Sequence, residues 1–378
     1  MEQPSKHVMI LAGEASGDLH GARLVEKLRQ HDPSMRLSGM GLHRLREAGV
    51  ELLVDASSIA VMGLLEVLRR WPTIRRALNT IEEAIERECP DVLVLIDYVE
   101  FNLRMAAVAK RAGVSVFFYI SPQVWAWRPE RVEKIGKLVD QMAVVFPFEV
   151  DIYQRAGVPV DYVGHPLSGR VHASTTRSEF ILQLGIDEGK KIIGLLPGSR
   201  LQEVNALVPI MLDVAKQLIS KHRDLHFVIP CAPSVDPGLI ERQARAQGIQ
   251  SLTALSGQAY DVMAHSTSIV IASGTATLEA AMIGAPMAIV YRVSPISWLW
   301  MKRKLIIQKV GLANIVAQED VVPEFIQDDC RAELIAPEID RQLTDSDYRN
   351  QMIEKLSRVN ALLGDKDAAS EVARCVFA

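Results

Sequence analysis

Short, continuous runs of apolar residues recur along the whole chain, and longer stretches with helical periodicity separate them. The runs have the length of β-strands and lie at residues 8–11, 92–96, 114–119, 143–145, 160–163, 192–196, 226–229, 269–272 and 287–291. Strands that are apolar on both faces are typical of parallel sheets with helices on each side. The alternation therefore predicts an α/β fold with doubly wound parallel sheets.

The strand pattern stops between residues 164 and 191 and then starts again. This stretch has no long apolar run, and a new sequence of strand, glycine and helix, IIGLLPGSR, follows it. We therefore expect two Rossmann-like domains, at residues 1–168 and 169–343, that face each other across a cleft. Ligands of such sheets bind beyond the carboxyl ends of the strands.

Composition narrows the class of protein. A hydrophobic content of 49% with 23% charged residues, over 378 residues, is typical of a soluble chain with two domain cores. The net charge of −4 argues against a general nucleic-acid-binding protein, which would be basic. The four cysteines have no paired spacing, which fits a reducing, cytoplasmic compartment without a cysteine metal site.

One loop in the C-terminal half is suited to bind an anion. In LLPGSRLQEV an apolar strand ends before Gly198, and Ser199 can cap the helix expected at residues 201–221. Arg200 adds a permanently charged guanidinium that fits phosphate oxygens, and no acidic residue lies between residues 195 and 200. The alternative is a helix-capping turn with a surface arginine. Because neither a Walker sequence nor a complete dinucleotide fingerprint occurs, a hydride-transfer enzyme is poorly supported.

A second loop, IASGTATLEAA, has a similar character. Gly274 lets a ligand approach the backbone, and Ser273 and Thr275 supply hydroxyls where a helix starts. Glu279 lies about one turn further on, where it can accept hydrogen bonds from ribose hydroxyls; alternatively it only complements the helix dipole. Two helix starts of this kind and an acceptor for a diol favour a nucleoside diphosphate in the C-terminal half.

Acidic and aromatic residues mark the N-terminal half. Asp97 follows a buried strand in VLVLIDYVEFN, where a carboxylate can take a proton from an attacking hydroxyl or simply bind backbone amides. Glu14 and Asp18 make the GEASGD loop a poor phosphate site, so we expect it to bind an uncharged sugar. Trp125 in ISPQVWAWR can stack on that sugar or lie in the core. His165 is a second base, a phosphate donor or a structural histidine.

Two segments combine apolar and basic residues, IAVMGLLEVLRRWPTIRRALNTI at 59–81 and ISWLWMKRKLIIQK at 296–309. Such helices can lie at a bilayer surface; the alternative is burial in the core with arginines extending outward. Two of them on one chain favour contact with anionic lipid. The residues that we expect at the lipid surface are Val61, Met62, Leu64, Leu65, Leu68, Trp298, Lys302 and Arg303.

Taken in order, the motifs GEASGD, VMGLLEVL, ISPQVWAWR, KIGK, LLPGSR, SGTATLE and VVPEFIQ resemble the lipid-A-disaccharide synthase family, bacterial glycosyltransferases of the GT-B fold. The resemblance covers nearly the whole chain. It implies transfer of 2,3-diacylglucosamine from its UDP donor to the 6-hydroxyl of 2,3-diacylglucosamine 1-phosphate, with inversion and without a metal. It also implies a Gram-negative, cytoplasmic enzyme at the inner-membrane surface. C-terminal helices at 344–378 would pack back on the first domain or be exchanged in a homodimer.

The resemblance also assigns roles to particular residues. Asp97 matches the essential aspartate of the family and Arg200 its phosphate-binding arginine, so that Asp97 would deprotonate the acceptor while Arg200 stabilises the departing diphosphate. Further donor-site positions are matched by Ser199, Ser273, Thr275, Glu279 and Asn314. The chain departs from the family pattern at Val99 and Glu100, where relatives have Pro and Asp, and in the loop around Asn314.

Two other functions stay open. A UDP-sugar 2-epimerase could use the same scaffold, but it would need acid and base groups at C2 of the donor and no lipid contact. The second alternative is a protein that binds a nucleotide sugar but has no catalytic activity. The variant Asp97→Ala distinguishes it from an enzyme, since only an enzyme would lose turnover.

Overall fold

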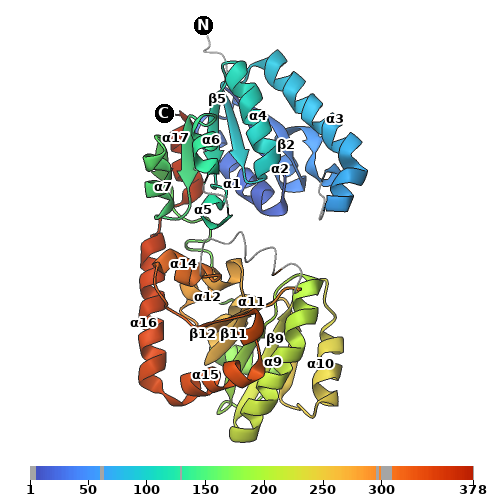
Figure 1. Cartoon of the computed structure of the whole chain (residues 1–378), viewed down its shortest axis with the longest axis vertical. Coiled ribbons are helices and arrows are strands. Elements are labelled where there is room, and N and C mark those ends of the chain that lie inside the picture. The colour runs from blue at the N-terminus through green and yellow to red at the C-terminus, as the bar shows by residue number, and fades with distance from the viewer. Residues whose placement is uncertain (1–5, 60–63, 128–129, 295–297, 299–308, 378) are drawn as a thin grey trace. The chain divides into compact units, whose positions relative to one another are not determined.

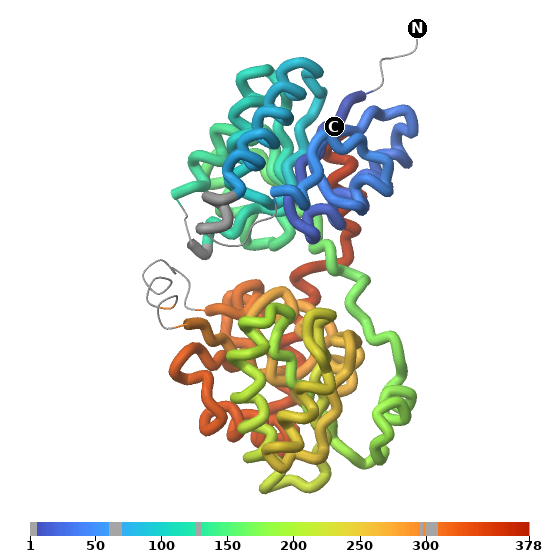
Figure 2. Tube along the Cα trace, turned by 90° about the vertical axis from the view of Figure 1, so that its right-hand side faces the viewer, coloured from blue at the N-terminus to red at the C-terminus, as the bar shows by residue number. Residues whose placement is uncertain are grey.

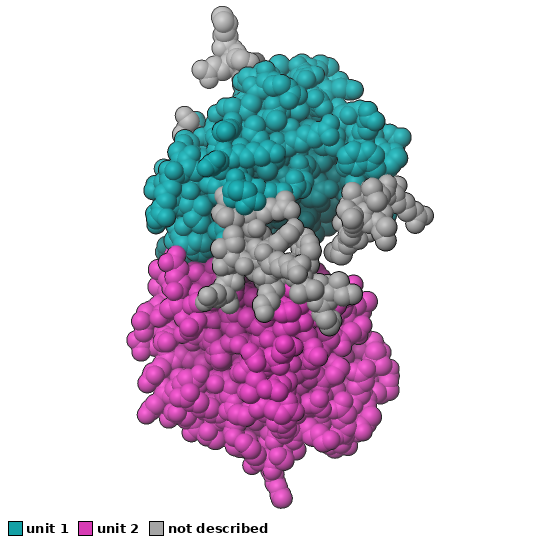
Figure 3. All heavy atoms as spheres, in the orientation of Figure 1, with its two compact units in different colours: residues 1–168, 363–378 teal, residues 169–362 magenta. Residues whose placement is uncertain are grey.

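The computed structural model describes residues 6–59, 64–127, 130–294, 298 and 309–377, without the side chains of residues 64–69, 126 and 127. It divides into two compact units, unit 1 with Met1–Ser168 and Leu363–Ala378, and unit 2 with Gly169–Leu362 (Figure 3). Each unit contains one parallel sheet, which confirms the predicted α/β fold.

Unit 1 is built on a sheet of strand order β3-β2-β1-β4-β5-β6-β7, in which the paired neighbours are parallel. Apart from one 3₁₀ turn, its described elements are β1 His7–Ala12, α1 Ala15–His31, β2 Arg36–Gly41, α2 His43–Glu47, β3 Glu51–Asp55, α3 Leu64–Glu88, β4 Val92–Ile96, α4 Val99–Arg111, β5 Ser115–Tyr119, α5 Val124–Trp127, α6 Arg131–Gly136, β6 Gln141–Val144, α7 Glu149–Arg155, β7 Val160–Tyr162 and α17 Ala368–Phe377.

Unit 2 is built on a second parallel sheet of order β10-β9-β8-β11-β12-β13. Apart from another 3₁₀ turn, its described elements are α8 Arg177–Leu184, β8 Lys191–Leu196, α9 Leu201–Lys221, β9 Leu225–Cys231, α10 Pro237–Ala246, β10 Leu252–Ser256, α11 Ala259–His265, β11 Ser268–Ala272, α12 Thr275–Ile283, β12 Met287–Tyr291, α14 Leu312–Ala317, β13 Glu324–Ile326, α15 Ala332–Thr344 and α16 Ser346–Leu363.

The apolar pattern predicted the central strands, and it also predicted the edge strand β7. Every residue of β1, β4 and β11 is buried, because helices cover both faces of each sheet. The strands β2, β3, β10 and β13 were not predicted. β2 has the sequence RLSGMG, and a Cβ atom at Gly39 would lie 1.9 Å from the carbonyl oxygen of Ile10 on β1. Glycine is required there because the two strands approach each other closely. Since glycine interrupts the apolar run, the sequence pattern did not predict this strand.

The C-terminal helices divide between the units. The helix α16 groups with unit 2 up to Leu362, whereas α17 packs on α1 of unit 1, so that the red end of the chain lies beside the blue beginning (Figures 1 and 2). Lys6 Nζ donates to the carbonyl oxygen of Val376 (2.7 Å), and Lys27 forms an ion pair with Asp367 (3.2 Å). These contacts make residues 363–378 part of unit 1.

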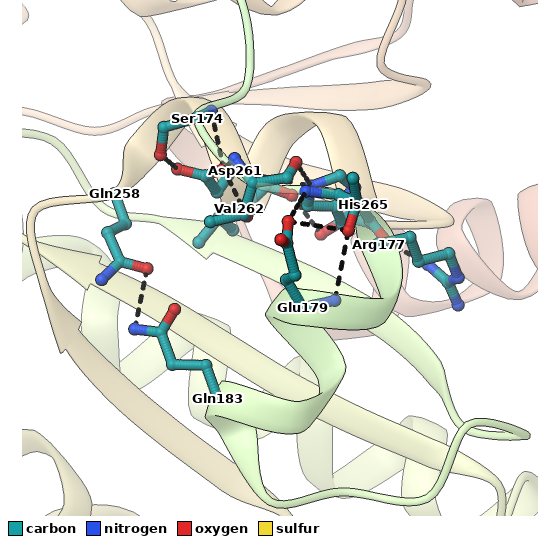
Figure 4. Close-up of polar contacts among 11 residues, drawn as sticks. Ser174, Arg177, Glu179, Gln183, Gln258, Asp261, Val262 and His265 are labelled. Atoms are coloured by element: carbon teal, nitrogen blue, oxygen red, sulfur yellow. Dashed lines mark hydrogen bonds and ion pairs between the residues drawn. The ribbon is translucent and has the colours of Figure 1, made fainter.

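Asp261 and His265, both on α11, attach the first segment of unit 2 to that helix, His265 through its Nε2 and the carbonyl oxygen of Thr175 (2.8 Å; Figure 4). Asp261 accepts hydrogen bonds from the backbone N–H and the hydroxyl of Ser174 (2.9 and 2.7 Å) and from those of Thr175 (2.8 and 2.7 Å). Burial alone would raise the pKa of Asp261, but these hydrogen bonds hold it below its usual value. The segment 169–176 is therefore tied to the body of unit 2.

Candidate functional site

Asp97 lies at the carboxyl end of β4 on a strained turn. Asp97 (φ +50°) and Tyr98 (φ +45°) both have left-handed backbone, which costs a residue other than glycine about 1–2 kcal/mol. The buried Asn102 stabilises the turn, since its Nδ2 donates to the carbonyl oxygens of Asp97 (2.6 Å) and Ile96 (3.2 Å). Burial raises the pKa of Asp97, against the hydrogen bond from the Tyr98 N–H, and a raised pKa makes the carboxylate a stronger base.

The first glycine of the GEASGD loop makes room for an aromatic ring. A Cβ atom at Gly13 would lie 2.2 Å from Cγ of Tyr98, so no larger residue fits without moving the ring. Because β1 and β4 are neighbours, the loops that follow them adjoin. Glu14 is exposed. The main cause of the raised pKa of Tyr98 is the burial of its own ring, and the second cause is the negative charge of Glu14. The structure thus brings Glu14 close to the turn that carries Asp97.

Asp18, the other acid of this loop, has a structural role. Its side chain is fully buried (0% exposed). The carboxylate accepts hydrogen bonds from the backbone N–H groups of Leu42 (2.6 Å), Arg44 (3.0 Å) and Leu45 (3.3 Å). These groups lie at the start of α2, where backbone donors have no partner within the helix. Asp18 therefore caps α2 instead of facing a sugar, in contrast to the sequence-based expectation.

Trp125, on α5, is held by a buried acid that the sequence analysis did not single out. Its Nε1 donates to Glu149 Oε1 (3.1 Å), and Glu149 Oε2 accepts from the backbone N–H of Phe146 (3.1 Å). The Trp125 ring also meets Phe148 edge to face, with 5.1 Å between the centroids. Burial raises the pKa of Glu149 to about 7. An acid soon after a buried strand is the signal that identified Asp97, and it would have identified Glu149 too.

His165 has the surroundings of a structural histidine. Its ring is buried, and the ring centroid lies 5.3 Å from that of Phe146. Its Nδ1 accepts a hydrogen bond from the backbone N–H of Leu167 (3.3 Å). Burial, with a smaller contribution from His20, lowers the pKa of His165 to about 4. The ring is therefore neutral at neutral pH. Of the three roles considered for it, this geometry favours the structural one.

In unit 2, the loops after β8, β9, β10 and β11 line a cavity of about 480 Å³. This is the carboxyl edge of the sheet, where α/β proteins bind their ligands. The cavity gathers the predicted donor-site residues other than Asn314, namely Gly198, Ser199, Arg200, Ser273, Gly274, Thr275 and Glu279.

The helix α9 begins at Leu201 as predicted, but its N-cap is Arg200 and not Ser199. Glu203 lies over this start: its Oε1 accepts from Arg200 Nη1 (2.9 Å) and its Oε2 from the Arg200 backbone N–H (3.4 Å). A Cβ atom at Gly198 (φ +99°) would lie 2.4 Å from Glu203 Oε2. Glu203, in the first turn of α9, therefore lies against this loop. An anion that binds there must share Arg200 with the Glu203 carboxylate.

The helix α12 starts at Thr275, as the sequence predicted, and its N-cap is Gly274. The Ser273 hydroxyl donates to the carbonyl oxygen of Val310 (2.7 Å), which leaves that hydroxyl to act toward a ligand as an acceptor. Burial raises the pKa of Glu279, against the hydrogen bond that the Tyr260 hydroxyl donates to its Oε1 (2.9 Å). Tyr260 is a second residue that the sequence analysis missed, together with the strand before it.

Asn314 does not line the cavity of unit 2; its amide stabilises a loop. The Nδ2 donates to the Val322 carbonyl (2.8 Å) and to Glu324 Oε1 (2.8 Å), while Oδ1 accepts from the backbone N–H groups of Val321 (2.8 Å) and Val322 (3.0 Å). These hydrogen bonds, all within unit 2, use both N–H groups and the oxygen of the side-chain amide. Asn314 therefore shapes the region next to α14, in contrast to the direct donor contact expected from the resemblance.

Part of the expected lipid surface can be located. On α3, Trp71 is 49% exposed next to the exposed Arg75 and Arg76, and these residues line a surface cavity of about 560 Å³. Trp298 is half-buried. The other expected lipid contacts lie outside the described residues or side chains: Val61, Met62, Leu64, Leu65, Leu68, Lys302 and Arg303.

The described part of the chain lacks two kinds of feature. No helix in it has both the length and the apolar character needed to cross a membrane. No three His, Cys, Asp or Glu side chains in it group closely enough to hold a metal ion.

Comparisons with known proteins cover the full length. A family model described as Lipid-A-disaccharide synthetase matches residues 8–376. The lipid-A-disaccharide synthase of Geobacter sulfurreducens is 48% identical over 376 residues, which are 100% of this chain and 98% of that protein. Among solved structures, the glycotransferase of kitacinnamycin has a TM-score of 0.67 at 13% identity, over 99% of each chain. The UDP-GlcNAc 2-epimerase from Neisseria meningitidis, bound to UDP-GlcNAc, has a TM-score of 0.63 at 13% identity, over 98% and 99%. At such identity these two structures establish the fold alone, which is that of GT-B glycosyltransferases.

Proposed function

The chain belongs to the lipid-A-disaccharide synthase family, and we propose that it transfers 2,3-diacylglucosamine from UDP to the 6-hydroxyl of 2,3-diacylglucosamine 1-phosphate. As a member of this family it is a glycosyltransferase of lipid A biosynthesis. The products of the proposed reaction are the β-1,6-linked disaccharide 1-phosphate and UDP. The observation that carries the proposal is the cavity of unit 2, which gathers two helix starts, an arginine and a half-buried carboxylate.

In this proposal the cavity of unit 2 holds UDP. The backbone N–H groups at the starts of α9 and α12 and the guanidinium of Arg200 bind the diphosphate. Arg200 is suited to this because its side chain is 70% exposed while Glu203 orients it. As the bond between the sugar and the diphosphate breaks, these groups stabilise the growing negative charge, a task that a metal ion performs in other transferases.

In unit 1, we assign the acceptor to the loops around Asp97, with Glu14 and Trp125 binding its sugar. Oxygen O6 of the acceptor attacks C1 of the donor sugar, the bond from C1 to the β-phosphate oxygen breaks, and Asp97 takes the proton from O6. A single displacement of this kind inverts the configuration at C1. Asp18 is left out of the acceptor site because its carboxylate is buried at the start of α2.

The test is incubation with UDP-2,3-diacylglucosamine and 2,3-diacylglucosamine 1-phosphate, with mass spectrometry and NMR of the products. We expect UDP and a β-linked disaccharide, in the presence of EDTA as well as in its absence. Asp97→Asn should lower turnover by about 10²–10⁴-fold, the usual contribution of a general base. Asp91→Asn, at the opposite end of the same strand, is the matched control. A donor converted at C2 without any disaccharide would instead establish an epimerase.

The donor site is tested separately by calorimetric binding of UDP. Arg200→Ala should weaken UDP binding by about 10-fold or more, because it removes a charge-assisted hydrogen bond. Arg245→Ala is the matched control, since Arg245 also pairs with a glutamate one turn away (Glu241, 3.1 Å) and has a similar exposure of 64%, on α10. If the wild type and both variants bound UDP with equal affinity, the proposal that UDP binds in this cavity would be refuted.

We further propose that the enzyme works as a homodimer in the cytoplasm, at the inner-membrane surface. The exposed Trp71 with Arg75 and Arg76 supports contact with anionic lipid. Replacing both arginines with Ser should reduce sedimentation with phosphatidylglycerol vesicles, while replacing Arg87 at the far end of α3 should not. Equilibrium ultracentrifugation tests the dimer, because the chain mass is 41.9 kDa and a particle of that mass would refute it.

A further inference from the structure

The cavity of unit 2 contains a carboxylate whose orientation is set by a neighbouring helix. Glu279 lies on α12 and lines the cavity, while Tyr260 lies on α11, which packs against α12. The Tyr260 hydroxyl donates to Glu279 Oε1 at 2.9 Å. Glutamate has three rotatable side-chain bonds, so a donor on one oxygen restricts where the other oxygen can lie.

The chemistry of this pair fits the recognition of hydroxyl groups. An ionised carboxylate only accepts hydrogen bonds, and two oxygens offer about four positions for donors. Within the described part of the chain Tyr260 occupies one of them, and Oε2 and the remaining position on Oε1 stay available to a ligand. Burial, and then the charge of Glu279, raises the pKa of Tyr260 to about 12, so the phenol keeps its proton and stays a donor at neutral pH.

We propose that Tyr260 is a positioning residue for the ribose of the bound nucleotide: it orients Glu279 so that the carboxylate accepts hydrogen bonds from the ribose hydroxyls, and it thereby gives the cavity a preference for ribonucleotides over 2′-deoxyribonucleotides. This rests on the proposed function, and in particular on UDP binding in the cavity. Tyr260 itself is not assigned a contact with the ligand, and it acts through Glu279.

The experiment compares UDP with 2′-deoxy-UDP as ligands of the full-length chain, by isothermal titration calorimetry. The quantity of interest is the dissociation constant of 2′-deoxy-UDP divided by that of UDP. A general loss of structure changes both constants and leaves this ratio unchanged. Tyr260→Phe keeps the ring and removes only the hydroxyl. We expect this variant to lower the ratio at least about threefold, mainly by weaker binding of UDP, as for the loss of one hydrogen bond to a charged group.

The chain offers a closely matched control. Tyr348 also donates its hydroxyl to a glutamate at 2.9 Å, Glu338 in unit 2, and neither residue lines the cavity. Tyr348→Phe should leave the ratio as in the wild type. Glu279→Ala removes the acceptor of the Tyr260 hydroxyl and should lower the ratio, and adding Tyr260→Phe to Glu279→Ala should change it no further, since two residues that act through one contact are not additive.

The possible failures are distinguishable. If Glu279→Ala lowers the ratio and Tyr260→Phe leaves it unchanged, or weakens both ligands equally, the positioning role of Tyr260 is refuted while the donor site stands. If Tyr260→Phe still lowers the ratio in the Glu279→Ala background, Tyr260 contacts the ribose directly and the inference is also refuted. If the wild type binds neither ligand, the proposed donor site fails, and this inference fails with it.

Discussion

Replacing Asp18 with Asn tests whether this carboxylate stabilises α2 or binds the acceptor sugar. Its two oxygens are buried against backbone N–H groups, Oδ1 accepting from Leu42 and Oδ2 from Arg44. An amide keeps one oxygen but places an NH₂ donor where the other was, facing an N–H donor. The variant therefore loses a hydrogen bond to a charged acceptor, about 1.5–3 kcal/mol, and leaves a buried N–H without a partner, about 1–3 kcal/mol.

Because both figures describe the same lost contact, they overlap, and we expect a net destabilisation of about 2–4 kcal/mol. For a domain the size of unit 1, each 1 kcal/mol lowers the thermal midpoint by about 2–4 °C, so the decrease should be about 5–15 °C. Scanning calorimetry measures it. Asp151→Asn changes an exposed carboxylate on α7 of the same unit, and this matched control should shift the midpoint by less than about 2 °C.

Kinetics then separate the two roles of Asp18. At a temperature where both proteins are folded, a structural role leaves the KM for the acceptor within about twofold of the wild type, a range that corresponds to less than 0.5 kcal/mol. An unchanged thermal midpoint together with a KM raised tenfold or more would refute our reasoning and would place Asp18 in the acceptor site.

Three further results are expected. Burial raises the pKa of Glu149 from 4.5 to about 7, so the folded state holds this proton more tightly than the unfolded chain, and stability falls by roughly 3 kcal/mol as the pH rises through this window. Urea midpoints of Glu149→Gln should lack this decline, and an identical decline in the variant would contradict it. The pKa of His165, lowered to about 4, predicts a neutral ring at pH 6 in an NMR titration and loss of stability as the pH falls from 6.5 toward 4; a midpoint near 6.5 would show that the ring is not buried. Gly13→Ala should displace the Tyr98 ring and reduce turnover at least about tenfold, since small displacements near a reacting group are costly, while UDP binding in unit 2 stays unchanged. Full turnover in this variant would mean that the ring moves without consequence.

The fold could be predicted to the extent that burial leaves a continuous trace in the sequence. The strands β1, β4, β8 and β11 lie in the middle of their sheets, and their apolar runs predicted them. The strands β3, β10 and β13 lie at sheet edges and are only partly buried, so polar residues interrupt or flank their short apolar stretches, whereas the edge strand β7 was predicted. The strand β2 was hidden by Gly39, which a neighbouring backbone requires.

The candidate site divides in the same way. Loops that depend on residues next to each other, such as those at Gly198–Arg200 and Ser273–Thr275, could be recognised from the sequence alone, because a strand end, a glycine and a helix start are local features. The partner of a charged side chain is not local. Asp18 meets α2 24 residues away, and Tyr260 meets Glu279 19 residues away.

By itself, then, the order of residues determined the two parallel α/β domains, the family and two of the loops that line the cavity of unit 2. The tertiary structure alone decided which acids face a cavity and which cap a helix. The physical reason is that a buried carboxylate is stable only with donors around it, and folding brings those donors from distant parts of the chain.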